Sequence, residues 1–243
     1  WAMRINDAGL IAGTSSIAGD AAERATAWSA AGVATDLGTL GGSYSWVNAL
    51  NDAGDAVGSS AVAGDSERHA TLWRSGTLAD LGTLGGSYST AFWINKHGQV
   101  TGASYTVADA EEHATLWSGG AAIDLNDYLD PALSIAGWYL AQALAVNDDG
   151  WIVANGYDGS GNDVSFLLVP DAPTGVPEPG VLALTSVALG AERLQELETL
   201  RYLRARLDAL VQLLPAQLRA PSDPSGAGEA FAAAALPELR AEL

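Results

Sequence analysis

The sequence of 243 residues contains no cysteine. A disulfide framework, a thiolate metal site and a thiol nucleophile are therefore excluded. Because disulfides would have marked an oxidising compartment, their absence leaves the redox environment open and permits secretion without indicating it. The chain is nevertheless long enough to bury a sizeable hydrophobic core in one or two domains.

Basic residues are also scarce. The 11 Lys and Arg residues stand against 29 Asp and Glu residues, which gives a formal net charge of −18. Residues 1 to 176 carry 20 of the acidic residues and 5 of the basic ones. Because a surface this acidic repels phosphate groups, we expect no nucleic acid and no anionic membrane as a partner for this part of the chain. Cations and neutral polymers are better partners.

Long hydrophobic runs are missing as well. The apolar run at residues 181 to 191 is 11 residues long, whereas a transmembrane helix needs about 18 to 20. We therefore expect no transmembrane span. No charged-then-apolar signal peptide begins the chain, because residues 1 to 6 already match the repeat described below. We expect any leader to have been removed or the sequence to be a fragment.

What the sequence does contain is an internal repeat. The ten residues 36 to 45, Asp-Leu-Gly-Thr-Leu-Gly-Gly-Ser-Tyr-Ser, recur letter for letter at residues 80 to 89, and a third copy diverges after Leu125. Asn-x-x-Gly turns, separated by 45, 44 and 52 residues, begin at Asn6, Asn51, Asn95 and Asn147. Such a period indicates a repeat protein. The repeats span residues 1 to 42, 43 to 86, 87 to 136 and 137 to 170.

The residue pattern of each repeat is typical of four short β-strands. In the second repeat, residues 45 to 50 and 55 to 60 flank a turn that suits a left-handed glycine, and two further strands are predicted at residues 69 to 73 and 77 to 81. Four strands in about 44 residues is the size of one propeller blade. We therefore expect residues 1 to 170 to be an all-β, β-propeller-like array of about four four-stranded blades. Because the last repeat ends without a predicted fourth strand, the array would be partial or incompletely closed.

The C-terminal part has a different composition. Residues 171 to 180 are predicted to be a linker because they are rich in proline and glycine. Residues 181 to 243 are predicted to be an apolar and then amphipathic α-helical tail, because leucines recur every three or four residues from Leu194 to Leu214. This helix could pack on the repeats, self-associate or lie at a membrane surface. The oligomeric state is left open.

Histidines and aspartates at equivalent repeat positions indicate structural roles. The first position holds Arg24, His69 and His113, and the second holds Asp36, Asp80 and Asp124. We expect each of these carboxylates to accept hydrogen bonds from backbone amides of the adjacent turn. One active site would not need three copies of each residue. We therefore assign no catalytic residue.

Two segments break the repeat and are candidates for a binding site. Trp138 and Tyr139 are either exposed rings that stack on a sugar or, as we favour, core residues that seal the last repeat. The second segment offers side-chain oxygens at Asp158, Ser160, Asn162 and Asp163, which is similar to a Ca²⁺ loop. It lacks the glycine and the distal glutamate of an EF-hand, so a glycine-rich hairpin turn is favoured. No other cofactor is expected.

The repeated motifs resemble a known family. His-Ala-x-x-Trp at residues 69 to 73 and 113 to 117, with Asp-Leu-Gly-Thr-Leu-Gly-Gly and the Asn-x-x-Gly turns, resembles the HAF family of extracellular repeats in bacterial surface and secreted proteins. Pro177, Glu178 and Pro179, followed by the apolar run, resemble a PEP-CTERM sorting signal. This second resemblance implies recognition by an exosortase in an exopolysaccharide-producing Gram-negative bacterium. Together they imply an extracellular or cell-surface location.

These observations lead to one expected function and two alternatives. We expect a non-enzymatic secreted or cell-surface repeat protein that acts as a binding or structural scaffold in an exopolysaccharide matrix. Its partners would be polysaccharide or other surface proteins. The first alternative is a propeller-type polysaccharide hydrolase or lyase, which would need clustered carboxylates on one face. The second is a fragment of a larger propeller without independent function.

Overall fold

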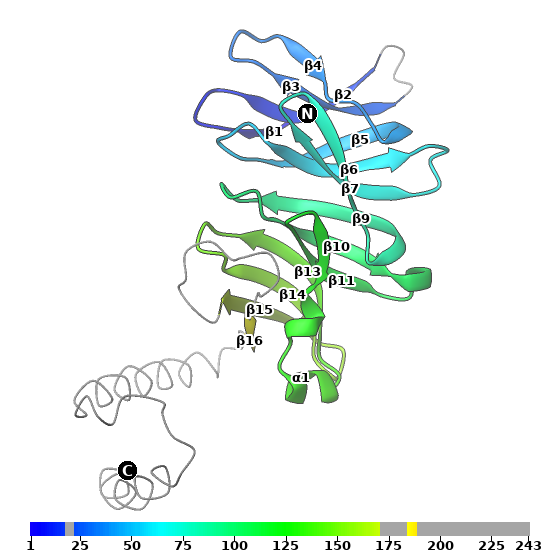
Figure 1. Ribbon diagram of the computed structural model, residues 1–243, viewed down its shortest axis with the longest axis vertical. Coiled ribbons are helices and arrows are strands. Elements are labelled where there is room, and N and C mark those ends of the chain that lie inside the picture. Colours follow the sequence, from blue (N-terminus) through cyan, green and yellow to red (C-terminus); the bar gives the residue numbers. More distant parts are fainter. Residues whose placement is uncertain (18–21, 171–183, 189–243) are drawn as a thin grey trace, which may run out of the picture. The chain divides into compact units, whose positions relative to one another are not determined.

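The structure, a computed structural model, describes residues 1–17, 22–170 and 184–188 (Figure 1). These residues form mostly β structure in several sheets, which confirms the all-β prediction. The first repeat is an antiparallel sheet whose strand order follows the sequence. Its strands are β1 (Ala2–Ile5), β2 (Ile11–Ser16), β3 (Glu23–Trp28) and β4 (Ala34–Asp36).

The second and third repeats have the same succession of four strands. The second contains β5 (Gly41–Leu50), β6 (Ala56–Val62), β7 (Arg68–Arg74) and β8 (Thr77–Gly82). The third contains β9 (Gly85–Ile94), β10 (Val100–Thr106), β11 (Glu112–Ser118) and β12 (Ala121–Asp124). A parallel pairing of Arg68 with Tyr88 connects β7 to β9, so the two repeats share one eight-stranded sheet.

The fourth repeat corrects two expectations. Its strands are β13 (Tyr139–Val146), β14 (Ile152–Tyr157), β15 (Asp163–Pro170) and β16 (Leu184–Ala188). The expectation that no fourth strand follows Pro170 is wrong, because β16 pairs with β15 in an antiparallel register. Residues 184–188, which were predicted to belong to the helical tail, form a strand instead. A short segment of this kind can satisfy its backbone hydrogen bonds by pairing with an open sheet edge.

The repeats are connected through the ten-residue motif. Asp36 accepts a hydrogen bond from the backbone amide of Gly38 (2.8 Å), which adopts a left-handed conformation at φ +84°. The buried Ser45 hydroxyl donates to the carbonyl of Gly38 (2.8 Å) and accepts from the amide of Ala25 (3.0 Å). The second copy has the same contacts at Asp80, Gly82, Ser89 and Ala70. The motif therefore attaches the first strand of one repeat to the third strand of the repeat before it.

A second connection, which we call the asparagine ladder, runs through Asn6, Asn51, Asn95 and Asn147. The Nδ2 of each asparagine donates to the backbone carbonyl of the next one, at 3.2 Å from Asn6, 3.1 Å from Asn51 and 2.9 Å from Asn95. The Oδ1 of each closes its own turn by accepting from the amide four residues later. Both ends of each side-chain amide in the first three turns are thereby used, one within a repeat and one between repeats.

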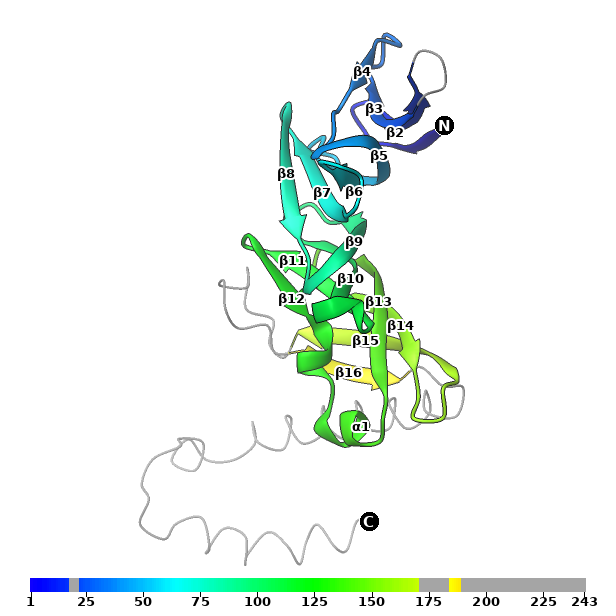
Figure 2. The ribbon, with the colours of Figure 1, turned by 90° about the vertical axis from the view of Figure 1, so that its right-hand side faces the viewer.

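The four repeats follow one another along the array in chain order (Figure 2), and a hydrophobic cluster lies between each pair of neighbours. Ala12 and Ala25 of the first repeat pack with Val47, Ala56 and Trp73 of the second. The next cluster joins the second and third repeats, and the largest joins the third and fourth around residues that include Leu116, Leu140, Ile152 and Phe166. Because neighbouring repeats bury apolar faces against each other, stability comes from stacking, as in other repeat proteins.

The sheets remain open. Within the residues that the structure describes, none of them closes on itself. The same residues contain no helix that is long and apolar enough to cross a membrane. The predicted linker and the helical part of the tail lie outside the described residues, apart from β16.

Candidate functional site

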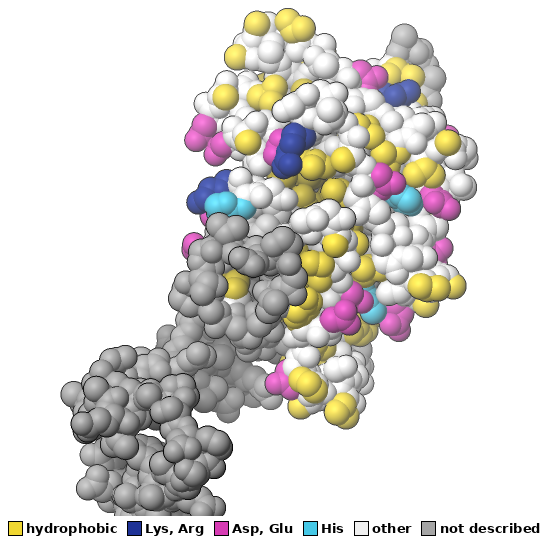
Figure 3. Space-filling model, in the orientation of Figure 1, with side chains coloured by type: hydrophobic (Ala, Val, Ile, Leu, Met, Phe, Trp, Pro, Cys, Tyr) yellow, Lys and Arg dark blue, Asp and Glu magenta, His cyan; other side chains and the backbone are white. Residues whose placement is uncertain are grey.

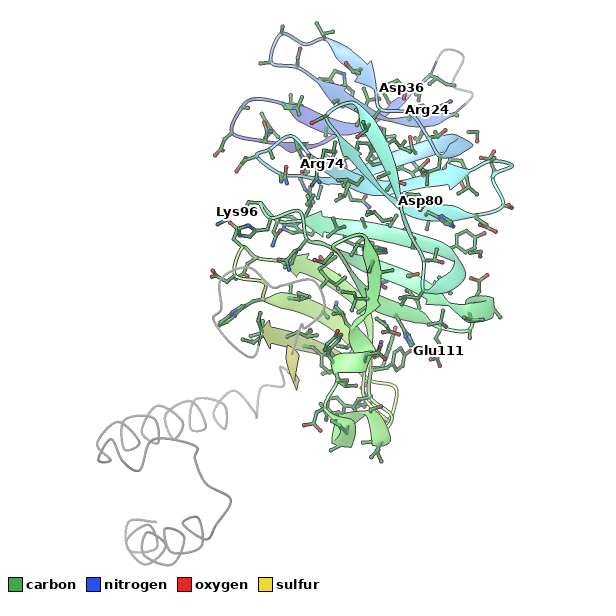
Figure 4. All side chains as sticks on the ribbon, in the orientation of Figure 1. Arg24, Asp36, Arg74, Asp80, Lys96 and Glu111 are labelled. Atoms are coloured by element: carbon green, nitrogen blue, oxygen red, sulfur yellow. The ribbon has the colours of Figure 1, made fainter. Side chains whose placement is uncertain are left out.

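In each of the first three repeats, a basic side chain on the third strand lies against an aspartate on the fourth. Arg24 lies 3.9 Å from Asp36, side by side with it in Figure 4. The Nδ1 of His69 lies 2.8 Å from Asp80, and the Nδ1 of His113 lies 2.6 Å from Asp124. The second oxygen of each carboxylate accepts from the backbone amide two residues later. The predicted turn-capping role of the aspartates is confirmed.

The His113 pair has the clearest electrostatic consequence. The hydrogen bond to Asp124 raises the pKa of His113 against the opposing effect of partial burial, and Glu111 adds to the rise. Burial opposes ionisation of Asp124, but the hydrogen bonds from His113 and Asn126 outweigh it, so the pKa of Asp124 is lowered. Each partner therefore favours the charged form of the other. In Figure 3, acidic side chains also lie beside the histidines on the visible face.

A cleft of about 450 Å³ lies between the third and fourth repeats, close to this pair. The third repeat contributes Tyr105 from β10, Glu111, and Glu112 from β11. The fourth contributes Tyr139 and Gln142 from β13 and Tyr157 from β14. Glu111 is labelled in Figure 4, beside the start of β11.

The cleft lies where the repeat pattern changes. After Leu125 the chain forms two short helices, η3 (Leu125–Tyr128) and α1 (Pro131–Ile135), the latter capped by Asp130, whose carboxylate accepts from the amide of Ala132 at 2.8 Å. Asn126 stands two residues after Asp124, at the position that Gly38 and Gly82 occupy in the preceding repeats. Its side chain donates to the carbonyl of Leu140 (2.9 Å) and accepts from the Leu140 amide (2.7 Å). This pair of bonds positions the start of β13, and with it Tyr139.

Two tyrosine rings form one wall of the cleft. The ring centroids of Tyr139 and Tyr157 are 5.2 Å apart, and the rings are inclined by 36°. Gly156 lets the two strands approach, because a Cβ there would lie 1.9 Å from the Tyr139 carbonyl oxygen. Burial raises the pKa of Tyr139, and Tyr157, Glu111 and Glu112 add to the rise. The phenol therefore stays protonated and can donate a hydrogen bond.

Polar side chains line the rest of the cleft. Gln142 Nε2 donates to Glu112 Oε2 (3.1 Å), and Glu111 Oε2 lies 3.3 Å from His113 Nε2. Asn155 and Asp163 also line it. Apolar ring faces next to carboxylate and amide groups can stack on one face of a sugar and hydrogen-bond to its hydroxyl groups.

The two predicted ring residues have different environments. The Trp138 ring packs edge to face on the buried Phe166, with centroids 6.1 Å apart, and lies partly buried against the largest core cluster. Tyr139 is part of the cleft wall. The core interpretation therefore holds for Trp138, while Tyr139 is placed where a ligand could be contacted.

The candidate calcium residues lie at the β14–β15 turn. Asp158 accepts hydrogen bonds from the amides of Ser160 (2.8 Å) and Asn162 (3.0 Å) and from the Asn162 side chain (2.9 Å). These bonds lower the pKa of Asp158, the one from the Asn162 side chain most. The turn contains a left-handed Gly161, as the hairpin interpretation requires. Asp163 starts β15 and lines the cleft. In the described parts of the chain no three His, Asp or Glu side chains are grouped to hold a metal ion.

Most of the residues that line the cleft were not predicted from the sequence. Tyr105 and Tyr157 both follow their turn asparagine by ten residues, where the second repeat has Ala61. This aromatic replacement in two adjacent repeats is the signal that could have identified the wall. The predicted sorting residues Pro177, Glu178 and Pro179 lie outside the described residues.

Comparison with known protein families, with curated proteins and with solved structures gives no match.

Proposed function

We propose that this chain is a non-enzymatic, secreted or cell-surface repeat protein that binds a neutral polysaccharide in the cleft between its third and fourth repeats. The observation that carries the proposal is the tyrosine wall of Tyr139 and Tyr157 beside the hydrogen-bonding side chains of Glu112, Gln142 and Asn155. Aromatic faces recognise the apolar face of a sugar ring, and carboxylate and amide groups recognise its hydroxyl groups.

The charge of the protein supports a neutral ligand. A net charge of −18 and three acidic side chains in the cleft would repel an acidic polysaccharide. Neutral hexose polymers carry no such penalty.

The proposal also covers the arrangement of the four repeats and the cellular location of the protein. The four repeats are interpreted as blades of a propeller-like array of the HAF type, with β16 completing the fourth blade. The Pro177-Glu178-Pro179 motif is interpreted as an exosortase sorting signal, which would bring the protein to the surface of a Gram-negative-type bacterium. The regular four-strand period and the shared hydrogen bonds of the ten-residue motif support the interpretation of the repeats as blades.

A second candidate is a polysaccharide hydrolase or lyase. It is favoured by the presence of Glu111, Glu112 and Asp163 in one cleft, since such enzymes use paired carboxylates. We prefer the binding function because Glu112 is engaged by Gln142, and Glu111 by His113.

Affinity electrophoresis and calorimetry with neutral glucans, mannans and galactans would test the proposal. We expect binding by the intact chain, and a loss of about tenfold or more in affinity for Tyr157→Ala, which corresponds to about 1.4 kcal/mol. Tyr44→Ala is the matched control, because Tyr44 packs on Trp46 in the second repeat, with ring centroids 4.8 Å apart. Equal losses for both variants, or binding of acidic polymers alone, would contradict the proposal. Release of reducing ends or unsaturated products would favour the enzyme.

A further inference from the structure

The asparagine ladder has two open ends. Asn147 is exposed, and no described residue accepts a hydrogen bond from its Nδ2, whereas the amides of Asn6, Asn51 and Asn95 each reach the next repeat. At the other end, the carbonyl of Asn6 accepts, among the described residues, only from Gly9 in its own turn. The carbonyl of Asn51 shows that this group can accept two bonds, from Gly54 and from the preceding asparagine.

A parallel set of contacts has matching ends. Asp7 donates its amide to Asp52 Oδ1 (3.1 Å), and Lys96 donates its amide to Asp148 Oδ1 (3.1 Å). The Lys96 ammonium also lies 3.2 Å from Asp148. In both contacts the backbone amide of one turn donates to the aspartate carboxylate of the next turn. At the ends of the array, the Asp148 amide could donate in the same way and the Asp7 carboxylate could accept. The last turn is thus complementary to the first.

The outer face of the fourth repeat is apolar and uncovered by any described residue. Val153 pairs with Ala145 at the position where Val57 pairs with Ala49 in the second repeat. Val57 is fully buried against the third repeat, whereas Val153 is 41% exposed. Leu144 and Trp151 nearby are 39% and 38% exposed. This face has the composition of a surface that packs on a following repeat.

The outer face of the first repeat is its complement. Ala2 and Ile11 occupy the positions of Val47 and Ala56, which are 1% and 3% exposed because they pack on the first repeat. Here Ala2 is exposed, Ile11 is half-buried and the neighbouring Ile5 is 68% exposed. This apolar face corresponds to the face of the second repeat that packs on the first.

We propose that a second copy of this chain covers these faces, with the fourth repeat of one copy stacked on the first repeat of the next. The contact would reproduce the packing already present between successive repeats of one chain, including the Asn147 to Asn6 hydrogen bond. The first repeat of a second copy supplies the group that the ladder lacks at Asn147, because the carbonyl of Asn6 would accept from Asn147 Nδ2 as the carbonyls of Asn51, Asn95 and Asn147 accept from the preceding asparagine within one chain. Because the two surfaces differ, the association is head to tail and is not limited to two copies.

Sedimentation velocity and light scattering of the intact chain at about 1 to 200 µM would test the proposal. We expect the average mass to rise with concentration beyond that of a dimer. Val153→Asp and Ile5→Asp should each reduce the mass to that of a single chain, since each places a charge in one of the two faces. Val107→Asp is the matched control because Val107, 71% exposed, lies in the third repeat.

Mixing the two variants provides the decisive measurement. The Val153→Asp copy keeps an intact first repeat and the Ile5→Asp copy keeps an intact fourth repeat, so a head-to-tail contact predicts a one-to-one dimer that grows no further. Asn147→Asp should weaken association by about tenfold while the fold remains intact. A single-chain mass at every concentration, association that persists in both variants, or a mixture that stays monomeric would each overturn the proposal.

Discussion

At the scale of single residues, the side-chain amide explains why asparagine begins every turn. Asn51 is 8% exposed, its Oδ1 closes its own turn at 2.9 Å, and its Nδ2 reaches the next repeat at 3.1 Å. Only a side chain with one donor group and one acceptor group can do both. Aspartate has no donor and would leave the contact to the next repeat unmade.

Asn51→Asp should therefore destabilise the fold by about 2 to 3 kcal/mol, because it places a carboxylate against the Asn95 carbonyl. Asn147→Asp removes no contact made by the described residues and should cost less than about 0.5 kcal/mol at concentrations where the chain is monomeric. Urea unfolding followed by circular dichroism would measure both free energies. Equal costs would mean that the interrepeat hydrogen bond contributes nothing.

The His113–Asp124 pair makes stability depend on pH. Because the pKa of His113 is raised on folding, its contribution is complete below its unfolded pKa of about 6.5 and is lost as the pH rises through the folded pKa. The pKa of Asp124 is lowered, so its contribution is present above about pH 3.9 and is lost as the pH falls through its folded pKa. The pair therefore stabilises most between these limits.

We expect His113→Gln to lose more stability at about pH 5.5 than at about pH 8.5, as measured by urea unfolding at both values. His97→Gln is a suitable control, because His97 lies in the exposed turn that begins at Asn95. A pH-independent difference between His113→Gln and the parent chain would show that the ion pair contributes little.

At the scale of secondary-structure elements, the fourth repeat depends on a strand from a distant segment. β16 pairs with β15 through five registered residues, from Phe166 with Ala188 to Pro170 with Leu184. Without β16, the edge of β15 would present unpaired backbone groups. The apolar run that follows the Pro177-Glu178-Pro179 motif thus has a structural role here.

Val187→Pro should lower the melting temperature by about 2 to 4 °C, because proline has no amide donor and is disfavoured inside a paired strand, at a cost of about 1 kcal/mol. Val187→Ala retains the backbone donor and is the control. Differential scanning calorimetry would measure both. If the two variants melted together, the pairing of β16 would not stabilise the repeat.

At the scale of the whole molecule, stability is distributed over the interfaces between repeats. Each of the three hydrophobic clusters takes side chains from two neighbouring repeats, and the terminal repeats have one covered face each among the described residues. In such arrays, an added interface stabilises the end that it covers.

If copies associate head to tail, the melting temperature should rise with protein concentration, because association stabilises the folded state by mass action. Val153→Asp should abolish this dependence. Scanning calorimetry at about 5 and 200 µM would test it. A melting temperature that is independent of concentration in the parent chain would contradict the association.

The sequence alone determined the repeat, the strands of the first three repeats and the turn-capping role of the recurring aspartates, because these depend on contacts that are local or return at a fixed period. The positions of Asn51, Asp80 and Gly82 follow from turn chemistry, which needs only neighbouring residues. The expectation that the acidic repeats bind no phosphate-bearing partner also comes from the sequence and stays a prediction. The structural role of Asp124 follows from its two identical counterparts.

Tertiary structure decided what depends on segments brought together from outside the period. The cleft combines Glu112 with Tyr139 and Tyr157, which no spacing rule connects, and β16 pairs with β15 across an intervening stretch without repeat signals. The uncovered faces also became visible only when Val153 could be compared with its buried counterpart Val57. Burial is a property of the packed neighbours, so a sequence pattern gives equivalent residues but not what lies against them.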